Sequence, residues 1–222
     1  IEQLFGAFGA AIAEHDYKGR YRGVYPIKVN QQRHVVEELV EYGAPHDLGI
    51  EAGSKPELLV ALALHENPDA FILCNGYKDR AFIETALLAQ KLGRQVIITV
   101  DRAQEIDTIL ACSRELDVRP VIGVRARLST KGAGKWVEST GDRSKFGLTT
   151  AELVETVEKL RGEGMLDCLQ LLHFHIGSQI TAIRAIKDAM REASRIYVEL
   201  FAMGAHMRYL DCGGGLGVDY DG

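Results

Sequence analysis

The sequence predicts an α/β protein in which parallel strands alternate with helices and close into a (β/α)8 barrel. Three observations support this fold. Short apolar or β-branched runs alternate with amphipathic stretches, the runs are apolar at nearly every position, and the ends of the first runs recur about every 25 residues. Strands that are apolar on both faces are typical of a parallel sheet covered by helices.

Each element can be placed from its own pattern. A helix-period segment at residues 2–15 precedes the sheet. Strands are expected at residues 22–29, 47–50, 70–74, 95–100, 120–126, 167–176 and 207–211. Helices are expected between them at residues 35–42, 55–66, 79–92, 103–116, 151–162 and 183–203. Thr149 and Glu152 form a capping-box pattern at the start of one helix, and Gly204 is a natural stop for another.

The distribution of polar residues favours a barrel over an open, doubly wound sheet. Polar residues recur at the ends of many expected strands, namely Lys28, Glu51, Asn75, Asp101, Arg125, His175 and Asp211. Active-site groups of a (β/α)8 barrel come from many strand ends, whereas an open sheet gathers them at one switch point. The seven expected strands imply that residues 1–222 are one incomplete barrel domain, with a closing strand beyond Gly222.

The composition excludes several classes of protein. The net charge is −5, and Lys and Arg are spread along the 222 residues, so no basic surface for general nucleic-acid binding is expected. No apolar run approaches the roughly 20 residues of a membrane span. Cys74, Cys112, Cys168 and Cys212 lack CxxC spacing, which indicates reduced thiols in a cytoplasmic protein. Because the chain starts with isoleucine and stops at Gly222 just after a strand, we expect a fragment.

Lys28 ends the first expected strand, in the segment Val24-Tyr25-Pro26-Ile27-Lys28-Val29-Asn30. An apolar strand end can desolvate a lysine and make its neutral amine available as a nucleophile. A lysine whose stem covers apolar surface while its charged head reaches water fits the same pattern. Taken alone, the residue leaves both interpretations open.

Two histidines lie near the end of the sixth expected strand, in His173-Phe174-His175-Ile176-Gly177-Ser178-Gln179. Strand alternation would place His173 and His175 on one face, where one imidazole could lie against a planar cofactor ring. The pair could instead ligate a metal, but no third ligand stands at a diagnostic spacing, so no metal site is predicted. A hydrogen-bonded structural histidine is the other alternative.

Three consecutive glycines, Gly213, Gly214 and Gly215, follow the last expected strand. Their backbone N–H groups can approach an anion without obstruction by side chains, which predicts a phosphate cradle. The segment is not a dinucleotide-binding GxGxxG motif, because Val218 stands where the third glycine of that motif would be. A plain turn is the alternative interpretation.

Glu51 and Arg125 are charged residues at the ends of the second and fifth expected strands. Either could bond a cofactor's phenolic oxygen or its lysine, and either could form a structural ion pair on the barrel rim. The glycine-rich segment 128–147 interrupts the strand–helix alternation and is expected to be a long loop on the catalytic face.

Together these motifs resemble the alanine-racemase-like class of pyridoxal-phosphate enzymes. The order is the specific part: Lys28 ends the first strand, His175-Ile176-Gly177-Ser178 follows a middle strand, and the three glycines follow a later one. Within this class the chain resembles the biosynthetic arginine decarboxylases from about residue 21 onward. The segments that carry this closer resemblance are 25–31, Lys131-Gly132-Ala133-Gly134-Lys135-Trp136, Lys145-Phe146-Gly147-Leu148, 173–179 and 213–222.

The resemblance implies a barrel of the alanine-racemase type that binds pyridoxal 5′-phosphate. It also implies decarboxylation of L-arginine to agmatine and carbon dioxide, a step of polyamine biosynthesis. Lys28 would form the Schiff base with the cofactor, and His175 would stack on the pyridine ring. Ser178 and the amides of Gly213, Gly214 and Gly215 would hold the phosphate.

Other family features are implied less directly or lie outside this chain. Glu51 and Arg125 match positions that contact the cofactor or its lysine less directly. The acid against the ring nitrogen, an arginine on the phosphate, and a cysteine and an aspartate from a neighbouring subunit's β domain are absent from the sequence. The resemblance also implies a homo-oligomer built from dimers, and it raises a magnesium requirement for which the sequence shows no ligand set.

The sequence leaves three other functions open. The first is another enzyme of the class, such as an ornithine or diaminopimelate decarboxylase or a racemase. The two decarboxylases share the lysine, the His-x-Gly-Ser motif and the glycine cluster, whereas the Gly-Lys-Trp segment points to arginine as the substrate. A non-catalytic pyridoxal-phosphate carrier would consist of the barrel alone. A barrel that binds some other phosphorylated ligand is the third.

Overall fold

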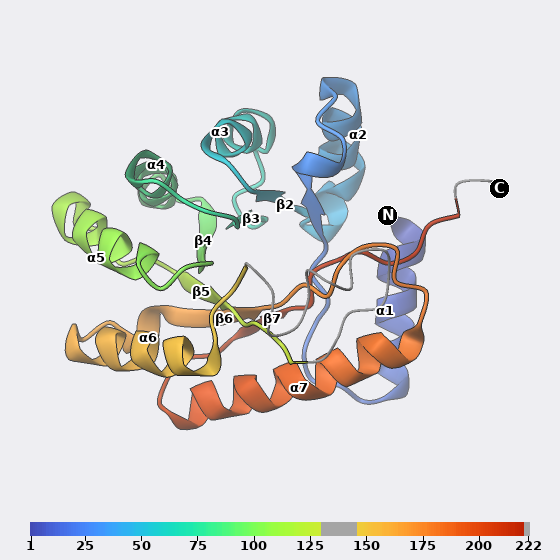
Figure 1. Ribbon diagram of the computed structural model, residues 1–222. Coiled ribbons are helices and arrows are strands. Elements are labelled where there is room, and N and C mark those ends of the chain that lie inside the picture. The colour runs from blue at the N-terminus through green and yellow to red at the C-terminus, as the bar shows by residue number, and fades with distance from the viewer. Residues whose placement is uncertain (130–145, 220–222) are drawn as a thin grey trace. The chain divides into compact units, whose positions relative to one another are not determined.

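The computed structural model describes residues 1–129 and 146–219. The chain divides into two compact units, Ile1–Ile97 and Ile98–Gly222, and each is described by itself. In both units strands alternate with helices in the predicted order (Figure 1). Most of the expected loop at residues 128–147, including the Gly-Lys-Trp segment, lies outside the described residues.

The first unit has three parallel strands that pair in sequence order. They are β1 (Val24–Pro26), β2 (Gly49–Ala52) and β3 (Phe71–Cys74). The helices are α1 (Glu2–Glu14), α2 (Arg33–Gly43), α3 (Lys55–Leu64) and α4 (Arg80–Lys91), with 3-10 turns η1 (Ile27–Val29) and η2 (Ala44–His46). The register sets Pro26 beside Glu51 and Glu51 beside Leu73.

The core of the first unit lies between these strands and the helices that cover them (Figure 1). All four residues of β2 and all four of β3 are buried, as expected for strands covered on both faces. Helices α2, α3 and α4 contribute buried side chains such as Val36, Leu58 and Phe82. Burying a side chain of this size stabilises the fold by about 1.5–3 kcal/mol.

The second unit continues the same pattern. Strand β4 (Gln95–Val100) spans the boundary between the units, and its last three residues pair in parallel with β5 (Ile122–Arg125). Strands β6 (Leu169–His173) and β7 (Tyr209–Asp211) follow in order, also parallel. The helices are α5 (Glu105–Leu116), α6 (Thr150–Gly162) and α7 (Ile183–Ala202), and the 3-10 turn η5 (Leu166–Cys168) precedes β6.

Two local predictions are confirmed in the second unit. The Thr149 side chain accepts from the Glu152 backbone N–H at 3.3 Å, and the Thr149 N–H donates to Glu152 Oε2 at 2.8 Å, which completes the capping box of α6. Gly204, just after α7, has a φ of 94°, as expected for a glycine that ends a helix.

Most strands are shorter than predicted, and two of these differences, in β1 and β6, concern the candidate site. The expected strand at residues 22–29 ends at Pro26, and Lys28 lies in the turn η1 that follows. Pro26 has no N–H with which to continue a strand ladder. Strand β6 ends at His173, so the expected extension to residue 176 is a loop instead.

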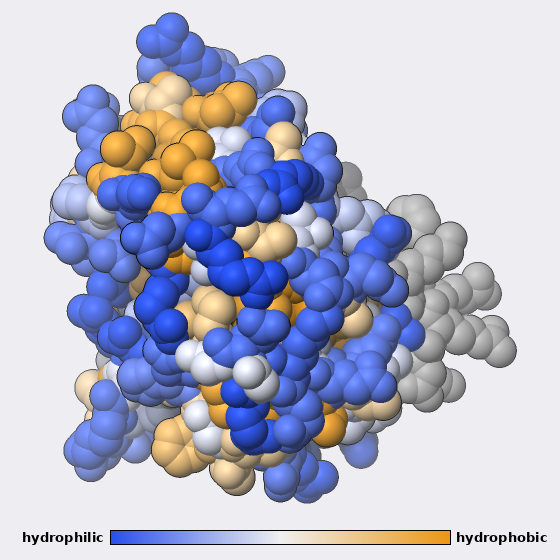
Figure 2. Space-filling view, turned by 90° about the vertical axis from the view of Figure 1, so that its left-hand side faces the viewer, coloured by the Kyte–Doolittle hydropathy of each residue, from blue (hydrophilic) through white to orange (hydrophobic). Residues whose placement is uncertain are grey.

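Among the described residues, no helix combines the length and the apolar character that crossing a bilayer requires. Hydrophilic residues cover most of the face in Figure 2, and hydrophobic residues gather mainly in its upper left part. Cys74, Cys112 and Cys168 are buried free thiols, whereas the free thiol of Cys212 is exposed.

Candidate active site

Lys28 lies on a short turn that is braced at both ends. The side chain of Ile27 is buried and anchors the turn, and the Tyr25 hydroxyl donates to the Asn30 carbonyl at 3.1 Å. The Asn30 side chain in turn accepts from the Gln32 N–H at 3.0 Å. Lys28 is exposed and has no hydrogen bond or ion pair with a described residue, so the expected desolvation by its strand is wrong, and its amine is accessible instead.

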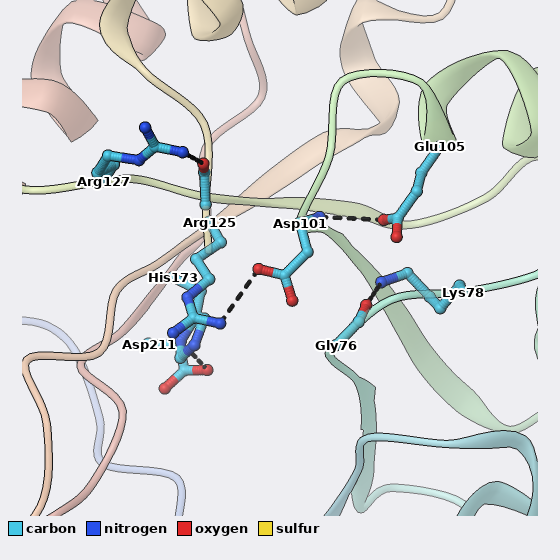
Figure 3. A network of polar contacts seen from close by, with 9 residues as sticks. Gly76, Lys78, Asp101, Glu105, Arg125, Arg127, His173 and Asp211 are labelled. Atoms are coloured by element: carbon cyan, nitrogen blue, oxygen red, sulfur yellow. Dashed lines mark hydrogen bonds and ion pairs between the residues drawn. The ribbon is translucent and has the colours of Figure 1, made fainter. Parts of the chain in front are cut away.

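Glu51 is the second candidate residue of the first unit. It is 7% exposed and lies on β2 beside Pro26, so Glu51 and the Lys28 turn come from the ends of adjacent strands. Burial raises the pKa of the neighbouring Cys74 thiol to about 12, an effect that Lys78 opposes and Glu51 increases. Lys78 also contacts the Gly76 carbonyl (Figure 3). Cys74 is therefore a protonated core residue.

Arg125, at the end of β5, belongs to a buried polar network in the second unit (Figure 3). Its Nη1 donates to Asp101 Oδ1 at 3.1 Å; the Asp101 side chain is fully buried, and that of Arg125 is 16% exposed. The Asp101 N–H donates to Glu105 Oε2 at 3.0 Å, and the Arg125 guanidinium lies 5.1 Å from the centroid of the Phe146 ring. The interpretation of Arg125 as part of a structural ion pair is therefore confirmed, and the pair holds its guanidinium at the strand end.

His173 and His175 have different environments. His173, at the end of β6, is buried, and its Nδ1 lies 2.8 Å from Asp211 Oδ2 on β7 (Figure 3). Burial alone would raise the pKa of Asp211, but His173, the Gly213 N–H and His175 together lower it. His175 lies beyond the end of β6 and is exposed. Because β6 ends at His173, the strand alternation that predicted a shared face for the two imidazoles does not extend to His175.

The glycine segment packs directly against the loop that follows β6. Gly213 and Gly215 have φ angles of 65° and 88°, which glycine adopts without strain. A Cβ on Gly213 would lie 2.6 Å from the Phe174 carbonyl oxygen, and one on Gly215 would overlap the Gly177 carbonyl group. Only glycine fits these two positions, so the close approach of the two loops requires the sequence observed here.

The two loops present hydrogen-bond donors that no described residue uses. The Gly213 N–H is occupied, because it donates to Asp211 Oδ1 at 2.9 Å. The N–H groups of Gly214 and Gly215 and the hydroxyl of Ser178 make no hydrogen bond among the described residues. Ser178, Gly213 and Gly214 are also exposed. This set of accessible donors fits a phosphate group, and Gly213 shapes the turn while its own amide is held by Asp211.

The described residues offer no comparable arrangement for a metal ion. No three His, Cys, Asp or Glu side chains are grouped so that they could hold one. In the second unit the accessible groups are instead an imidazole, a hydroxyl and backbone amides, on the loops after β6 and β7. Such groups suit an anionic ligand.

Sequence reasoning did not assign roles to Asp101, His173 and Asp211. Asp101 and Asp211 were noted only as polar residues at strand ends, and that position was the signal that could have found them. Their partners come from neighbouring strands, since Arg125, His173 and Asp211 are aligned across β5, β6 and β7. Which strands are adjacent is a property of the sheet, and the spacing of residues along the chain does not contain it.

The chain is similar to curated proteins over its whole length. It is 59% identical over 222 residues to a biosynthetic arginine decarboxylase of Nostoc sp., and these residues are 100% of this chain and 33% of that protein. It is also 59% identical over 222 residues to a biosynthetic arginine decarboxylase of Thermosynechococcus vestitus, covering 35% of that protein. The chain thus spans about a third of the length of these relatives.

Solved structures show the same fold. A crystal structure of the biosynthetic arginine decarboxylase from Campylobacter jejuni matches 99% of this chain with a TM-score of 0.90 at 40% identity, over 35% of that chain. A diaminopimelate decarboxylase from Helicobacter pylori, complexed with L-lysine, matches 98% of this chain with a TM-score of 0.76 at 25% identity, over 54% of that chain. These likenesses confirm the predicted fold, an incomplete (β/α)8 barrel of the alanine-racemase type.

The family model "Pyridoxal-dependent decarboxylase, pyridoxal binding domain" matches residues 8–222. That match covers nearly the entire chain, including the Lys28 turn, the His175 loop and the glycine segment. The accessible amine and the unused anion donors described above are consistent with it. The chain therefore belongs to the pyridoxal-dependent decarboxylase family, as a pyridoxal-binding domain.

Proposed function

We propose that the complete protein containing this chain decarboxylates L-arginine to agmatine and carbon dioxide with pyridoxal 5′-phosphate, as a step of polyamine biosynthesis. One observation carries this proposal: the chain is 59% identical, over every one of its 222 residues, to a protein named biosynthetic arginine decarboxylase. Its identity to the diaminopimelate decarboxylase of known structure is 25%. We therefore propose arginine as the preferred substrate.

Lys28 is proposed as the covalent attachment point of the cofactor. Its amine is exposed on a turn held by Tyr25, Ile27 and Asn30, so it can meet an aldehyde without rearrangement of the chain. When bound, the cofactor supplies an electron sink for the carbanion left by departing carbon dioxide. The residues of this chain would bind the cofactor and orient it, so that the reacting groups are held in one geometry.

Four residues are proposed to hold the rest of the cofactor. The imidazole of His175, which is exposed, would stack on the pyridine ring, and Ser178 with the N–H groups of Gly214 and Gly215 would bind the phosphate. Gly213 contributes through its backbone conformation, since its N–H already donates to Asp211. The support for the phosphate assignment is that the Ser178 hydroxyl and the N–H groups of Gly214 and Gly215 make no hydrogen bond among the described residues.

Glu51 and Arg125 are proposed to act on the cofactor from the ends of β2 and β5. Glu51 is buried on the strand next to the Lys28 turn, and Arg125 is held in place by Asp101. Charged groups that are held in place provide an electrostatic environment that does not need to reorganise during a reaction.

The proposal is tested by replacing Lys28 in the complete protein. Borohydride reduction of the wild-type protein with pyridoxal 5′-phosphate should label the peptide that contains Lys28, and Lys28→Ala should remove that label. The same change should lower agmatine formation by about 10²–10⁴-fold, the range typical of a catalytic group. The control is Lys187→Ala, which replaces another exposed lysine, on α7.

Substrate choice is tested on the same preparations. Arginine should be turned over faster than ornithine and diaminopimelate. A wild-type protein that carries no cofactor on Lys28 would refute the cofactor assignment, and turnover of another amino acid in place of arginine would refute the substrate.

The remaining properties are proposed for the complete protein. The match to about a third of the relatives' length supports a barrel completed by a further strand and a following β domain. We propose a homo-oligomer built from dimers, to be tested by light scattering. The free cysteines support a cytoplasmic location, because such thiols are typical of reducing compartments. No residue of this chain is proposed as a magnesium ligand.

A further inference from the structure

The loops after β6 and β7 are joined by backbone hydrogen bonds. The Ile180 N–H donates to the Gly215 carbonyl at 2.8 Å, and the Gly217 N–H donates to the Ile180 carbonyl at 3.0 Å. These bonds form a parallel bridge between Ile180 and Leu216. The two loops therefore act as one short piece of parallel structure beyond the ends of their strands.

Gln179 extends this connection with its side chain. Its Nε2 donates to the Val218 carbonyl at 3.0 Å, and its Oε1 accepts from the Val218 N–H at 2.8 Å. One side-chain amide thus satisfies both backbone groups of Val218, as a neighbouring strand would. We call this pair of bonds the Gln179 clamp.

The backbone of Gln179 is unusual for its residue type. Its φ is 55°, in the left-handed region that residues with a side chain adopt at a cost. Glycine would adopt this conformation more readily, as it does at Gly213 and Gly215. A glutamine in such a position indicates that its side chain is needed there, and the clamp is what the side chain provides.

The clamp lies next to the proposed phosphate donors. Gln179 directly follows Ser178, and Val218 lies three residues after Gly215. Ser178 and the pair Gly214 and Gly215 are on different loops, so they can bind one phosphate only if the distance between the loops is fixed. Among the described residues, the bridge and the clamp fix this distance on the side beyond Gly215.

We propose that Gln179 is a positioning residue, which holds the Ser178 loop and the glycine loop together so that both can bind the cofactor's phosphate. This inference rests on the proposed function, because it requires that the ligand be pyridoxal 5′-phosphate. Gln179 itself does not need to touch the cofactor. Its contribution is to set the spacing of donors before the ligand arrives.

Two substitutions separate the clamp from the size of the side chain. Gln179→Met keeps the length and removes both hydrogen bonds. Gln179→Glu keeps an acceptor for the Val218 N–H but cannot donate to the Val218 carbonyl. Gln170→Met is the matched control, because Gln170 lies on β6 at the opposite end from the loop, and among the described residues its side chain donates to the Asp167 carbonyl alone, at 3.3 Å.

The experiment compares two ligands on the cofactor-free complete protein. The dissociation constants of pyridoxal 5′-phosphate and of pyridoxal, which lacks the phosphate, are measured by absorbance titration. Each lost hydrogen bond corresponds to about a fivefold change in an equilibrium constant. We expect Gln179→Met, which loses two bonds, to raise the constant for pyridoxal 5′-phosphate by about 25-fold, and Gln179→Glu, which loses one, to raise it by about fivefold. Both variants should leave the constant for pyridoxal unchanged. Gln170→Met should change neither.

Other outcomes overturn the inference. Unchanged binding of pyridoxal 5′-phosphate, or an equal loss for both ligands, would mean that Gln179 does not act on the phosphate. If Gln179→Met does not fold, Gln179→Gly removes the clamp and the unfavourable φ together, and the same comparison is made with it. A wild-type protein that binds neither ligand would refute the proposed function, whereas wild-type binding with no selective loss refutes the role of Gln179 alone.

Discussion

Replacing Gly215 by alanine tests whether the proposed cradle depends on close packing between two loops. A Cβ at this position would overlap the Gly177 carbonyl group, lying 2.9 Å from its carbon and 3.1 Å from Ser178 Cα. These neighbours are backbone atoms, which cannot rotate away as a flexible side chain can. The alanine would also have to keep a φ of 88° or abandon the native turn.

The two costs can be estimated separately. The left-handed conformation costs an alanine about 1–2 kcal/mol relative to its ordinary conformation. Forcing an extra carbon into a packed site costs about 1–3 kcal/mol. We therefore expect Gly215→Ala to lower the free energy of unfolding by about 2–5 kcal/mol. It should also weaken the binding of pyridoxal 5′-phosphate, because Ser178 and Gly215 must move apart.

Two other glycines provide matched controls. Gly93 has a φ of 89°, and a Cβ there would meet nothing within 4 Å, so Gly93→Ala carries the conformational cost alone. Gly214 does not have a left-handed φ, and a Cβ added there would meet nothing within 4 Å, so Gly214→Ala carries neither cost. Urea unfolding of the cofactor-free complete protein should rank the losses as Gly214→Ala, Gly93→Ala and Gly215→Ala, from smallest to largest. A Gly215→Ala protein as stable as Gly93→Ala would refute the packing argument.

Two further predictions concern buried charge. Burial lowers the pKa of His65, although its hydrogen bond to the Leu48 carbonyl at 2.7 Å acts in the opposite direction. As the pH falls, the unfolded state therefore binds a proton at this histidine before the folded state does. The free energy of unfolding should decrease below about pH 6.5, by at most about 1.4 kcal/mol per pH unit. Urea unfolding between pH 7 and pH 5 should show a smaller loss for His65→Gln than for the wild type, and equal slopes would contradict this account. Asp101→Asn leaves Arg125 without its buried counter-charge and should cost about 3–5 kcal/mol. The double variant Asp101→Asn with Arg125→Met should lose less than the sum of the two single changes, and simple additivity would show that the pair is not coupled.

Much of the candidate site could be predicted because its chemistry is local in the sequence. Lys28, Ser178 and the three glycines belong to short segments whose residue types and order indicate a function. The capping box at Thr149 was likewise predictable, since its two partners are three residues apart. The extent of the strands was less predictable: Pro26 and His173 end β1 and β6, although apolar residues continue beyond them.

The hydrogen bonds distinguish the three glycines as donors to a phosphate. The sequence treated Gly213, Gly214 and Gly215 alike, but the Gly213 N–H donates to Asp211, which leaves the other two amides without a partner among the described residues. Arg125 makes the ion pair with Asp101 that was one of its two interpretations, and its contact with the cofactor stays a prediction. Such outcomes depend on competition between partners that are distant in the chain.

By itself, the sequence determined the alternation of strands and helices, the barrel class and the residue types available for chemistry, because hydrophobic period and glycine content act locally. Only the tertiary structure decided which polar groups meet. Asp211 pairs with His173 across two strands, and Gln179 clamps Val218 across two loops, 39 residues apart in the chain. Pairings of this kind follow from the parallel register of β6 and β7, which places residues that are remote in sequence within hydrogen-bond distance.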